Sequence, residues 1–263
     1  MGSVLLKTTS IDVRFGGVQA LSGVTIKVER GSITSLIGPN GAGKTTLFNV
    51  ISGFYRPDAG KVIFGDVDIT AMPSHQRAAA GLARTFQNIS LFRGMTVLDN
   101  VKLGAHARLQ SGVLSAGLYL GSAQREETAL REEIERDVIE LLEIDHIRKM
   151  EVSMLPYGLQ KRVELARALA MKPELLLLDE PVAGMNREET EDIARFILDI
   201  KEQWGATVLM VDHDMGVVMD ISDHISVLNF GRVIANGTPT QVQVEPAVVE
   251  AYLGSGRVRE IAR

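Results

Sequence analysis

Cysteine is absent from this 263-residue chain, which excludes disulfide bonds and thiolate metal sites. The five histidines stand far apart from one another and do not show the spacing of metal ligands; they are His75, His106, His146, His213 and His224. We therefore expect no structural metal ion in this protein.

Long apolar runs and targeting segments are also missing. The longest nearly uncharged stretch, residues 109–123, includes several serines and glycines and falls short of the ~20 apolar residues that cross a bilayer. Residues 1–6 have no charged-then-apolar leader, and Leu6 stands where a myristoylation motif requires Ser or Thr. These absences predict a cytoplasmic protein that does not itself span a membrane.

Positive charge is not in excess either, since the formal net charge is -5. An acidic chain argues against sequence-independent binding to nucleic acid, which requires a basic surface. Hydrophobic residues make up 45% of the sequence, enough for a substantial core. The chain is expected to fold as one large α/β domain or as a core with a small attached subdomain.

A phosphate-binding loop is the strongest feature that is present. A strand-like run, residues 32–37, is followed by the motif G-x-x-x-x-G-K-[ST], here Gly38, Pro39, Asn40, Gly41, Ala42, Gly43, Lys44, Thr45 and Thr46. The glycines let backbone N–H groups point at phosphate oxygens, and the helix that begins there adds its dipole. We expect Lys44 to reach the β- and γ-phosphates, Thr45 to ligate Mg²⁺, and Thr46 to contact the α-phosphate. A glycine-rich turn that merely starts a helix would not require the full motif.

Two apolar strands end in polar residues. Residues 175–178 read as a central parallel strand buried on both faces, and Asp179 and Glu180 follow directly. Because ligands bind at the carboxyl ends of strands in such sheets, these acids are expected beside the phosphate loop. Asp179 suits Mg²⁺ held through water, and Glu180 suits the orientation or deprotonation of an attacking water. Residues 206–211 form a similar strand that delivers His213 as a candidate γ-phosphate contact.

The remaining pattern predicts further strands and helices. We expect antiparallel strands at 4–13 and 23–28 around Gly16 and Gly17, further strands at 61–64 and 82–87, and a hairpin of 225–228 with 232–236. Helices are expected at 45–53, 71–81, 188–203 with Gly205 as the C-cap residue, and 242–253. Phe15 lies beside the first turn, where its ring would either stack on an adenine base or fill the sheet core.

Residues 99–150 differ in composition from the rest of the chain, because apolar sequence with glycines and serines is followed by a highly charged segment. This pattern predicts a mostly helical insertion. Ile134, Val138, Leu141 and Leu142 fall on one helical face, and the charged residues around them read as a solvated surface rather than a binding site. Gln87 lies just before this region and by itself does not indicate a function.

Taken together, these residues resemble the ATP-binding subunit of an ABC transporter over essentially the whole chain. In that family the adenine-stacking aromatic matches Phe15, the phosphate loop matches 38–45, and the Q-loop glutamine matches Gln87. The Walker B aspartate matches Asp179, the catalytic glutamate matches Glu180, and the switch histidine matches His213. The resemblance implies ATP and Mg²⁺ as cofactors, with Thr45, Gln87 and Asp179 at the metal.

The resemblance also implies a fold and an organisation: an α/β P-loop NTPase domain of the ABC type, with an antiparallel β subdomain and an inserted α-helical subdomain. The α/β core with the β subdomain would take about 1–98 and 170–240, the helical subdomain with the signature loop about 99–169, and a C-terminal helix and tail 241–263.

The family's signature loop, L-S-G-G-Q, is altered here. The corresponding residues are 155–160, and Pro156 replaces the serine whose hydroxyl would contact the partner subunit's γ-phosphate. Tyr157 and Gly158 remain as nucleotide contacts, with the following helix N-terminus as an anion site. The D-loop, residues 183–186, ends in Asn186 where most relatives have aspartate.

These departures, an insertion at 112–121, the run Asp212–Met215 and the ending Ala251–Gly254 resemble one branch, the ATPase subunits of branched-chain amino acid importers. Close relatives of that branch serve urea or short amides, and related sequences energise lipopolysaccharide export. The resemblance implies a head-to-tail dimer, with a second copy or a similar ATPase, on two transmembrane permease subunits. It places the chain peripherally on the cytoplasmic face of the inner membrane, with a periplasmic or extracellular binding protein as an indirect partner.

Two other functions compete with this interpretation. A small GTPase or kinase would leave Gln87, residues 155–160 and His213 without a role, and the chain has no N-K-x-D guanine motif. A regulatory module that binds ATP but scarcely hydrolyses it would account for Pro156, whereas the intact Glu180 favours an ATPase.

Overall fold

The computed structural model describes residues 3–86, 89–106 and 121–253. Its larger sheet has six strands in the order β11 (Arg232–Gly237), β10 (His224–Asn229), β4 (Ile33–Ile37), β9 (Thr207–Val211), β8 (Leu175–Asp179) and β7 (Leu82–Arg84). Strands β10, β4, β9, β8 and β7 run parallel, and β11 is antiparallel to β10. All residues of β4, β8 and β9 are buried, which confirms the expected central parallel strands.

A second, antiparallel sheet contains β2 (Val18–Val24), β1 (Val4–Phe15), β5 (Ala59–Phe64) and β6 (Val67–Asp68), and β3 (Lys27–Glu29) also pairs with β1. The expected antiparallel subdomain is therefore confirmed. Its second strand begins at Val18 rather than Gly23, because Gly16 and Gly17 form a tight turn that pairs Phe15 directly with Val18.

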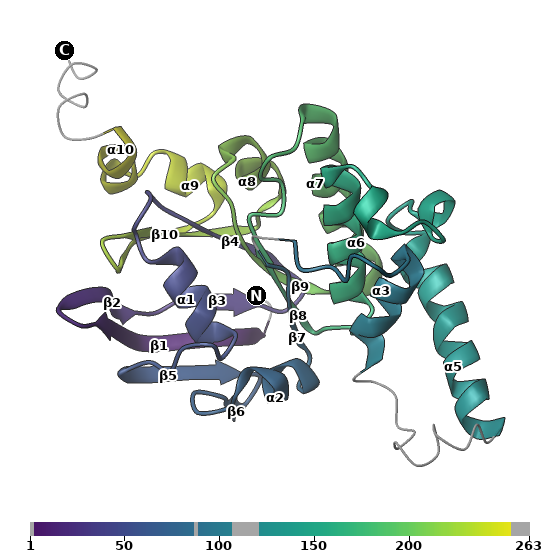
Figure 1. Cartoon of the computed structure of the whole chain (residues 1–263). Helices are drawn as coiled ribbons and strands as arrows, with labels where there is room; N and C mark the ends of the chain where they lie inside the picture. The colour runs from purple at the N-terminus through teal and green to yellow at the C-terminus, as the bar shows by residue number, and fades with distance from the viewer. Residues whose placement is uncertain (1–2, 87–88, 107–120, 254–263) are drawn as a thin grey trace.

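Helix α1 (Lys44–Ile51) lies between the two sheets (Figure 1). Its residues Leu47, Phe48, Val50 and Ile51 are fully buried in a core shared with residues of both sheets, such as Leu36 and Ile11. Helices α6 (Tyr157–Leu169), α7 (Arg187–Trp204) and α8 (Met215–Ile221) contribute to a second core on the other side of the six-stranded sheet. Packing on both sides fixes the loop between β4 and α1 relative to the strand ends.

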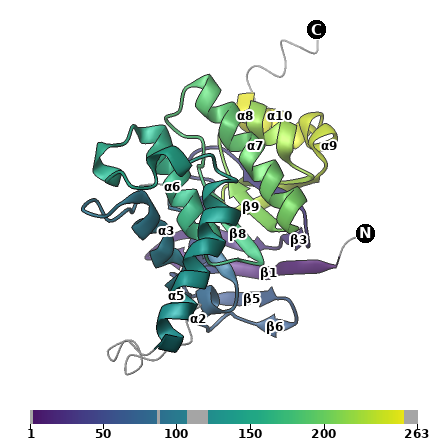
Figure 2. The same ribbon diagram turned by 90° about the vertical axis from the view of Figure 1, so that its right-hand side faces the viewer.

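The expected helical insertion is present to one side of the sheets (Figures 1 and 2). It includes α3 (Val97–Ala105), α5 (Gly121–Ile134), a π-helical turn (Glu135–Ile139) and two short 3₁₀ turns at 145–147 and 152–154. Ile134, Val138 and Leu142 are buried as their spacing predicts, and Leu141 is partly buried. A surface hollow between this region and α7 is lined by residues that include Arg136, Leu141, Arg195 and Trp204. Of the expected insertion at 112–121, residues 112–120 lie outside the described residues, and Gly121 is the first residue of α5.

Two helix predictions are wrong in extent, and proline accounts for both. The helix expected at 71–81 is only α2 (Ser74–Ala79), which follows Pro73 as its N-cap residue. The C-terminal helix expected at 242–253 is two helices, α9 (Pro239–Gln243) and α10 (Pro246–Leu253). Pro246 lacks an N–H and disfavours helical backbone at the residue before it, so the chain breaks there.

The strand expected at 82–87 is shorter than predicted, because β7 ends at Arg84. Two other local predictions hold. The β10–β11 hairpin is antiparallel, and α7 ends at Gly205 in the left-handed conformation, with φ of 62°. Among the described residues, no helix combines the length and apolar character that crossing a membrane requires.

Candidate nucleotide-binding site

The phosphate loop joins β4 to α1, as its sequence predicts. Gly38 and Gly43 both have positive φ and both lie against other backbone segments. A Cβ atom on Gly38 would lie 2.1 Å from the carbonyl oxygen of Leu228, and one on Gly43 would lie 2.8 Å from that of Ala20. These two glycines are required by packing as well as by conformation.

Lys44 is the first residue of α1 and reaches back over the loop. Its Nζ donates to the carbonyl oxygens of Gly38 at 2.6 Å and Pro39 at 3.1 Å. Burial lowers the pKa of Lys44, and the nearby Glu180 carboxylate opposes that shift. Thr45 is exposed in the first helical turn, and no described side chain caps the N-terminus of α1. Uncapped N–H groups beside a lysine form an anion site.

Asp179 and Glu180 lie where β8 ends, as predicted. Asp179 is buried, and its Oδ2 accepts a hydrogen bond from Arg84 at 2.8 Å. Glu180 has left-handed backbone with φ of 50°, held by its N–H donating to the carbonyl oxygen of Val211 at 2.8 Å. Such a conformation costs a non-glycine residue about 1 kcal/mol or more and is concentrated at functional sites.

His213 follows β9 and lies beside Glu180: its Nδ1 is 4.0 Å from Glu180 Oε1, and 67% of its side chain is exposed. The buried Asp212 shapes this loop, because its Oδ1 accepts from the backbone N–H groups of His213 at 2.7 Å and Asp214 at 2.9 Å. Burial raises the pKa of Asp212, and these hydrogen bonds oppose the shift. The sheet therefore brings Lys44, Glu180 and His213 to one edge.

The altered signature loop leads into α6, with Pro156 as its N-cap residue and no side-chain cap among the described residues. Gly158 is buried, and a Cβ atom there would lie 2.2 Å from Glu189 Oε1. The sequence did not predict this contact, and a side chain at 158 would displace the Glu189 carboxylate from its hydrogen bond with the Asn186 N–H. The Tyr157 ring lies against Gly184 of the D-loop, since a Cβ on Gly184 would be 3.4 Å from it.

Asn186, the second departure from the family pattern, is the N-cap residue of α7 in a capping box. Its Oδ1 accepts from the Glu189 N–H at 3.0 Å, and Glu189 Oε2 accepts from the Asn186 N–H at 3.0 Å. Asparagine and aspartate cap helices about equally well. The departure thus preserves the local structure of the D-loop.

Phe15 is 48% exposed, and its ring lies edge-on to Tyr55 with the centroids 5.3 Å apart. The interpretation of Phe15 as a sheet core residue is therefore wrong. The exposed ring remains available for an adenine base.

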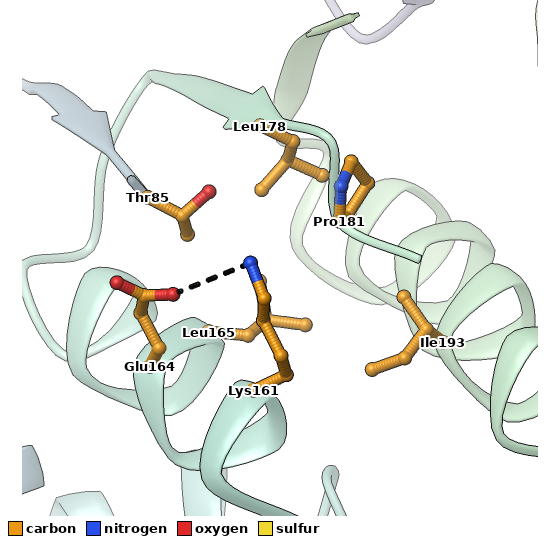
Figure 3. Close-up of a pocket in the computed structure, with 7 residues that line it drawn as sticks. All are labelled: Thr85, Lys161, Glu164, Leu165, Leu178, Pro181 and Ile193. Carbon is orange, nitrogen blue, oxygen red and sulfur yellow. Dashed lines mark ion pairs between the residues drawn. The ribbon is translucent and has the colours of Figure 1, made fainter. Parts of the chain in front are cut away.

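Gln87 lies outside the described residues, but the backbone on both sides of it is hydrogen-bonded to two side chains of α6, Lys161 and Glu164, which Figure 3 shows facing each other. Lys161 Nζ donates to the Phe86 carbonyl oxygen at 3.4 Å, and Glu164 Oε1 accepts from the Ser90 N–H at 3.4 Å. The two side chains form a buried ion pair at 3.9 Å in a small pocket that Thr85 also lines. Burial raises the pKa of Glu164, and Lys161 opposes that shift.

Two residues at the site were missed in the sequence. Arg84 binds Asp179, but one arginine in a short strand gives no signal of its partner. Tyr252 of α10 is half-exposed, and a hydrogen bond with the backbone of Gly38 opposes the rise in its pKa caused by burial. Figure 1 shows α10 beside the loop between β4 and α1.

The donor set fits a magnesium nucleotide. The Thr45 hydroxyl and the Asp179 carboxylate are hard oxygen donors of the kind that Mg²⁺ prefers. Among the described residues, no group of three or more His, Asp or Glu side chains could hold a metal ion alone. The remaining ligands would have to come from phosphate oxygens and water.

Comparison with known families gives two matches. Residues 21–183 match the ABC transporter family, and residues 232–258 match the branched-chain amino acid ATP-binding cassette transporter family.

Similar proteins cover nearly the whole chain. The high-affinity branched-chain amino acid transport ATP-binding protein BraF of Pseudomonas aeruginosa is 41% identical over 97% of this chain and 99% of its own length. The corresponding LivG of Escherichia coli is 40% identical over the same shares. A probable branched-chain amino acid transport ATP-binding protein LivG of Archaeoglobus fulgidus is 39% identical over 95% of this chain and 96% of its own length.

Solved structures agree with the fold. A nucleotide-free ATP-binding cassette from an ABC transporter has a TM-score of 0.82 and 35% identity, and covers 96% of this chain and 100% of that one. The ADP conformation of an ATP-binding cassette of an ABC transporter gives a TM-score of 0.82 and 35% identity, with 96% and 99% covered.

Proposed function

The chain belongs to the family of ABC transporter ATP-binding proteins, and from that membership we propose that it hydrolyses ATP to energise the import of branched-chain amino acids. The observation that carries the proposal is the meeting of Lys44, Glu180 and His213 at the carboxyl edge of the parallel sheet. The match of residues 232–258 to a branched-chain amino acid transporter family supports the cargo. It favours this cargo over urea, short amides or lipopolysaccharide.

The phosphate loop binds the nucleotide. Backbone N–H groups of Gly38 and of residues 40–46, together with the α1 dipole, receive the phosphates, and Lys44 leaves its loop carbonyls to pair with the β- and γ-phosphates. Thr46 contacts the α-phosphate, and Phe15 stacks on the adenine. Thr45, Asp179 and Gln87 would hold Mg²⁺, which would supply neutralisation of the developing charge.

Glu180 orients the attacking water and removes its proton. Its carboxylate is 4.0 Å from His213 Nδ1, and this proximity supports a shared role for the two side chains at the γ-phosphate. His213 contacts that phosphate, and the backbone bonds to Asp212 hold the histidine loop in place. Positioning and charge neutralisation supply most of what phosphoryl transfer needs.

Two ATPase subunits face each other head to tail in this proposal, with Tyr157 and Gly158 of each contacting the other's nucleotide. The uncapped first turn of α6 supports this role even though Pro156 supplies no hydroxyl. The partner ATPase is a second copy or a similar chain. The dimer sits on the cytoplasmic face of the inner membrane against two permease subunits, which receive cargo from a binding protein.

A regulatory module that binds ATP without hydrolysing it is the second candidate, and Pro156 at the N-cap of α6 favours it. The strained backbone of Glu180 argues for hydrolysis, because strain of this kind persists where function requires it.

Magnesium-dependent ATP hydrolysis by the purified chain tests the proposal beside Glu180→Gln, with size-exclusion chromatography of both in ATP. We expect the substitution to abolish turnover and to trap an ATP-dependent dimer. The matched control is Glu202→Gln on the exposed end of α7, which should hydrolyse ATP as the unchanged chain does. Nucleotide binding by the unchanged chain without turnover or dimerisation, even with candidate partner ATPases added, would favour the regulatory module.

A further inference from the structure

Arg84 is a buried arginine at the end of β7 that joins three side chains from two other elements. Its Nη1 donates to Asn49 Oδ1 at 2.8 Å and to Ser52 Oγ at 2.7 Å. Its Nη2 donates to Asp179 Oδ2 at 2.8 Å, and the side chains of this pair are only 8% and 5% exposed. The distances are those of well-formed charge-assisted hydrogen bonds.

Three aromatic rings surround the same guanidinium. Its Cζ lies 5.7 Å from the ring centroids of Phe48 and Phe54 and 5.4 Å from that of Phe86. Cation–π attraction at this range and the loss of solvent both favour one fixed position for the charged group. A guanidinium held in this way is a rigid connector rather than a mobile surface cation.

The residues that Arg84 joins belong to the two segments expected at the magnesium ion. Asn49 and Ser52 follow Thr45 by four and seven positions along α1 and its C-cap, so all three occupy one face of this helix. Asp179 ends β8. Arg84 therefore connects the helical face that presents Thr45 to the strand end that presents Asp179.

We infer that Arg84 is a positioning residue for the magnesium site, which fixes the Asp179 carboxylate relative to the Thr45 face of α1. This inference rests on the proposed function, since it takes Thr45 and Asp179 as magnesium ligands. Groups that hold a ligand from behind typically contribute 10- to 100-fold to metal affinity. Arg84 does not touch the nucleotide in this assignment; it acts through Asp179.

A purely structural ion pair is the competing explanation. Replacing a buried pair can be neutral or destabilising without any effect on ligand geometry, so a stability measurement cannot decide between the two. The discriminating quantity is the dependence of nucleotide binding on Mg²⁺, because loss of fold would weaken binding with and without the metal.

The experiment measures binding of a fluorescent ADP analogue to the full chain as Mg²⁺ is titrated, and again in EDTA. For Arg84→Met we expect the affinity for the ADP analogue in EDTA to stay within about twofold of that of the unchanged chain. The Mg²⁺ concentration that gives half of the maximal increase in this affinity should rise about 10-fold. Arg84→Lys should raise that Mg²⁺ concentration by less, since lysine can pair with Asp179 but cannot also donate to both Asn49 and Ser52. Asn49→Ala, which keeps the ion pair and removes one tether, should raise it by less as well.

Unfolding curves of each variant establish that it is folded, and Arg84→Lys and Asn49→Ala complete the test if Arg84→Met does not fold. An unchanged Mg²⁺ titration in the folded variants would overturn the inference, as would equal losses of affinity with and without Mg²⁺. Because no turnover is needed, a chain that shows the shifted titration but fails to hydrolyse ATP, even with candidate partner ATPases added, would refute the proposed function and leave Arg84 in its role.

Discussion

Charged residues at the nucleotide-binding edge and on the helical insertion have opposite surroundings. At the edge, Arg84, Asp179 and Asp212 are almost fully buried and bind groups that are distant in sequence. On the insertion, pairs such as Arg131 with Glu135 are partly exposed and join residues close in sequence. Buried, multiply bonded charges fix the positions of other groups, whereas exposed pairs contribute little to stability.

Helix α6 marks the boundary between the two regions. The sequence assigns it to the helical subdomain, yet Lys161 and Glu164 are as buried as the charges of the core. They contact Phe86 and Ser90, the backbone around Gln87. Whether a charged side chain is buried therefore depends on whether it faces the sheet or water, and not on the subdomain to which it belongs.

The largest effect is expected at Glu180, where function and backbone strain coincide. Glu180→Ala and Glu180→Gly should both lower ATP hydrolysis at least about 100-fold, since both remove the carboxylate. Glycine accepts positive φ, so the glycine variant should be more stable than the alanine variant by about 1 kcal/mol. Phosphate release and urea denaturation measure the two quantities, and equal stabilities would show that the backbone at this position is unstrained.

Substitution of Arg77 tests whether a buried arginine contributes more to the free energy of unfolding than an exposed arginine does. Its guanidinium donates to the carbonyl oxygens of Val50 and Ile51 at the end of α1, and to those of Thr70 and Met72. Burial lowers the pKa of Arg77 to about 10, so it stays charged at neutral pH. Arg77→Met should destabilise the fold by roughly 3 kcal/mol, because buried acceptors lose their donor.

The matched control for that substitution is Arg195→Met on α7. Arg195 is half-exposed and pairs with Glu143 and Asp192. Its replacement should change the free energy of unfolding by less than about 0.5 kcal/mol in the same urea experiment. Similar losses for both variants would break the distinction drawn between the two kinds of charge.

Asn186 of the D-loop is an exposed polar side chain that nevertheless caps a helix. Asn186→Ala should cost about 1 kcal/mol, whereas Asn186→Asp should be nearly neutral because both side chains cap well. Thermal unfolding of the two variants side by side checks this. A large loss with aspartate would mean that the asparagine has a role beyond the cap.

The smallest effect concerns Glu164 and appears as a pH dependence. Because burial raises its pKa above the ordinary value of 4.5, the folded chain binds this proton more tightly than the unfolded chain. The resulting stabilisation is complete below pH 4.5 and is lost as pH rises through the folded pKa. Relative to Glu164→Gln, the unchanged chain should therefore lose stability from pH 4.5 upward. Urea titrations at several pH values should show this trend, and Glu202→Gln should show none.

The phosphate loop and the two polar strand ends could be predicted because their chemistry is local. Apolar runs identify β8 and β9, parallel strands share an edge, and the residue after each run must emerge there. The proline breaks at Pro73 and Pro246 were also readable from the sequence, and the overlong helix predictions overlooked them.

The supporting residues could not be predicted in this way. Arg84 and Asp179 are 95 positions apart, and the contact of Glu189 with Gly158 depends on how α7 crosses the start of α6. A single sequence carries no signal of such pairs, because any arginine or glutamate in these helices and strands would show the same pattern. Their partners are decided by packing of elements that are far apart in the chain.

Trp204, in the hollow between the π-helical turn and α7, is an intrinsic fluorescence probe. Trp204 is the only tryptophan in the sequence, and it lines this hollow together with Arg136 and Leu141 of the helical insertion. Indole emission responds to the polarity and charge around it, so movement of the insertion against the core would change fluorescence without an attached label. Fluorescence of the unmodified protein is thus a direct test of whether nucleotide binding moves the insertion.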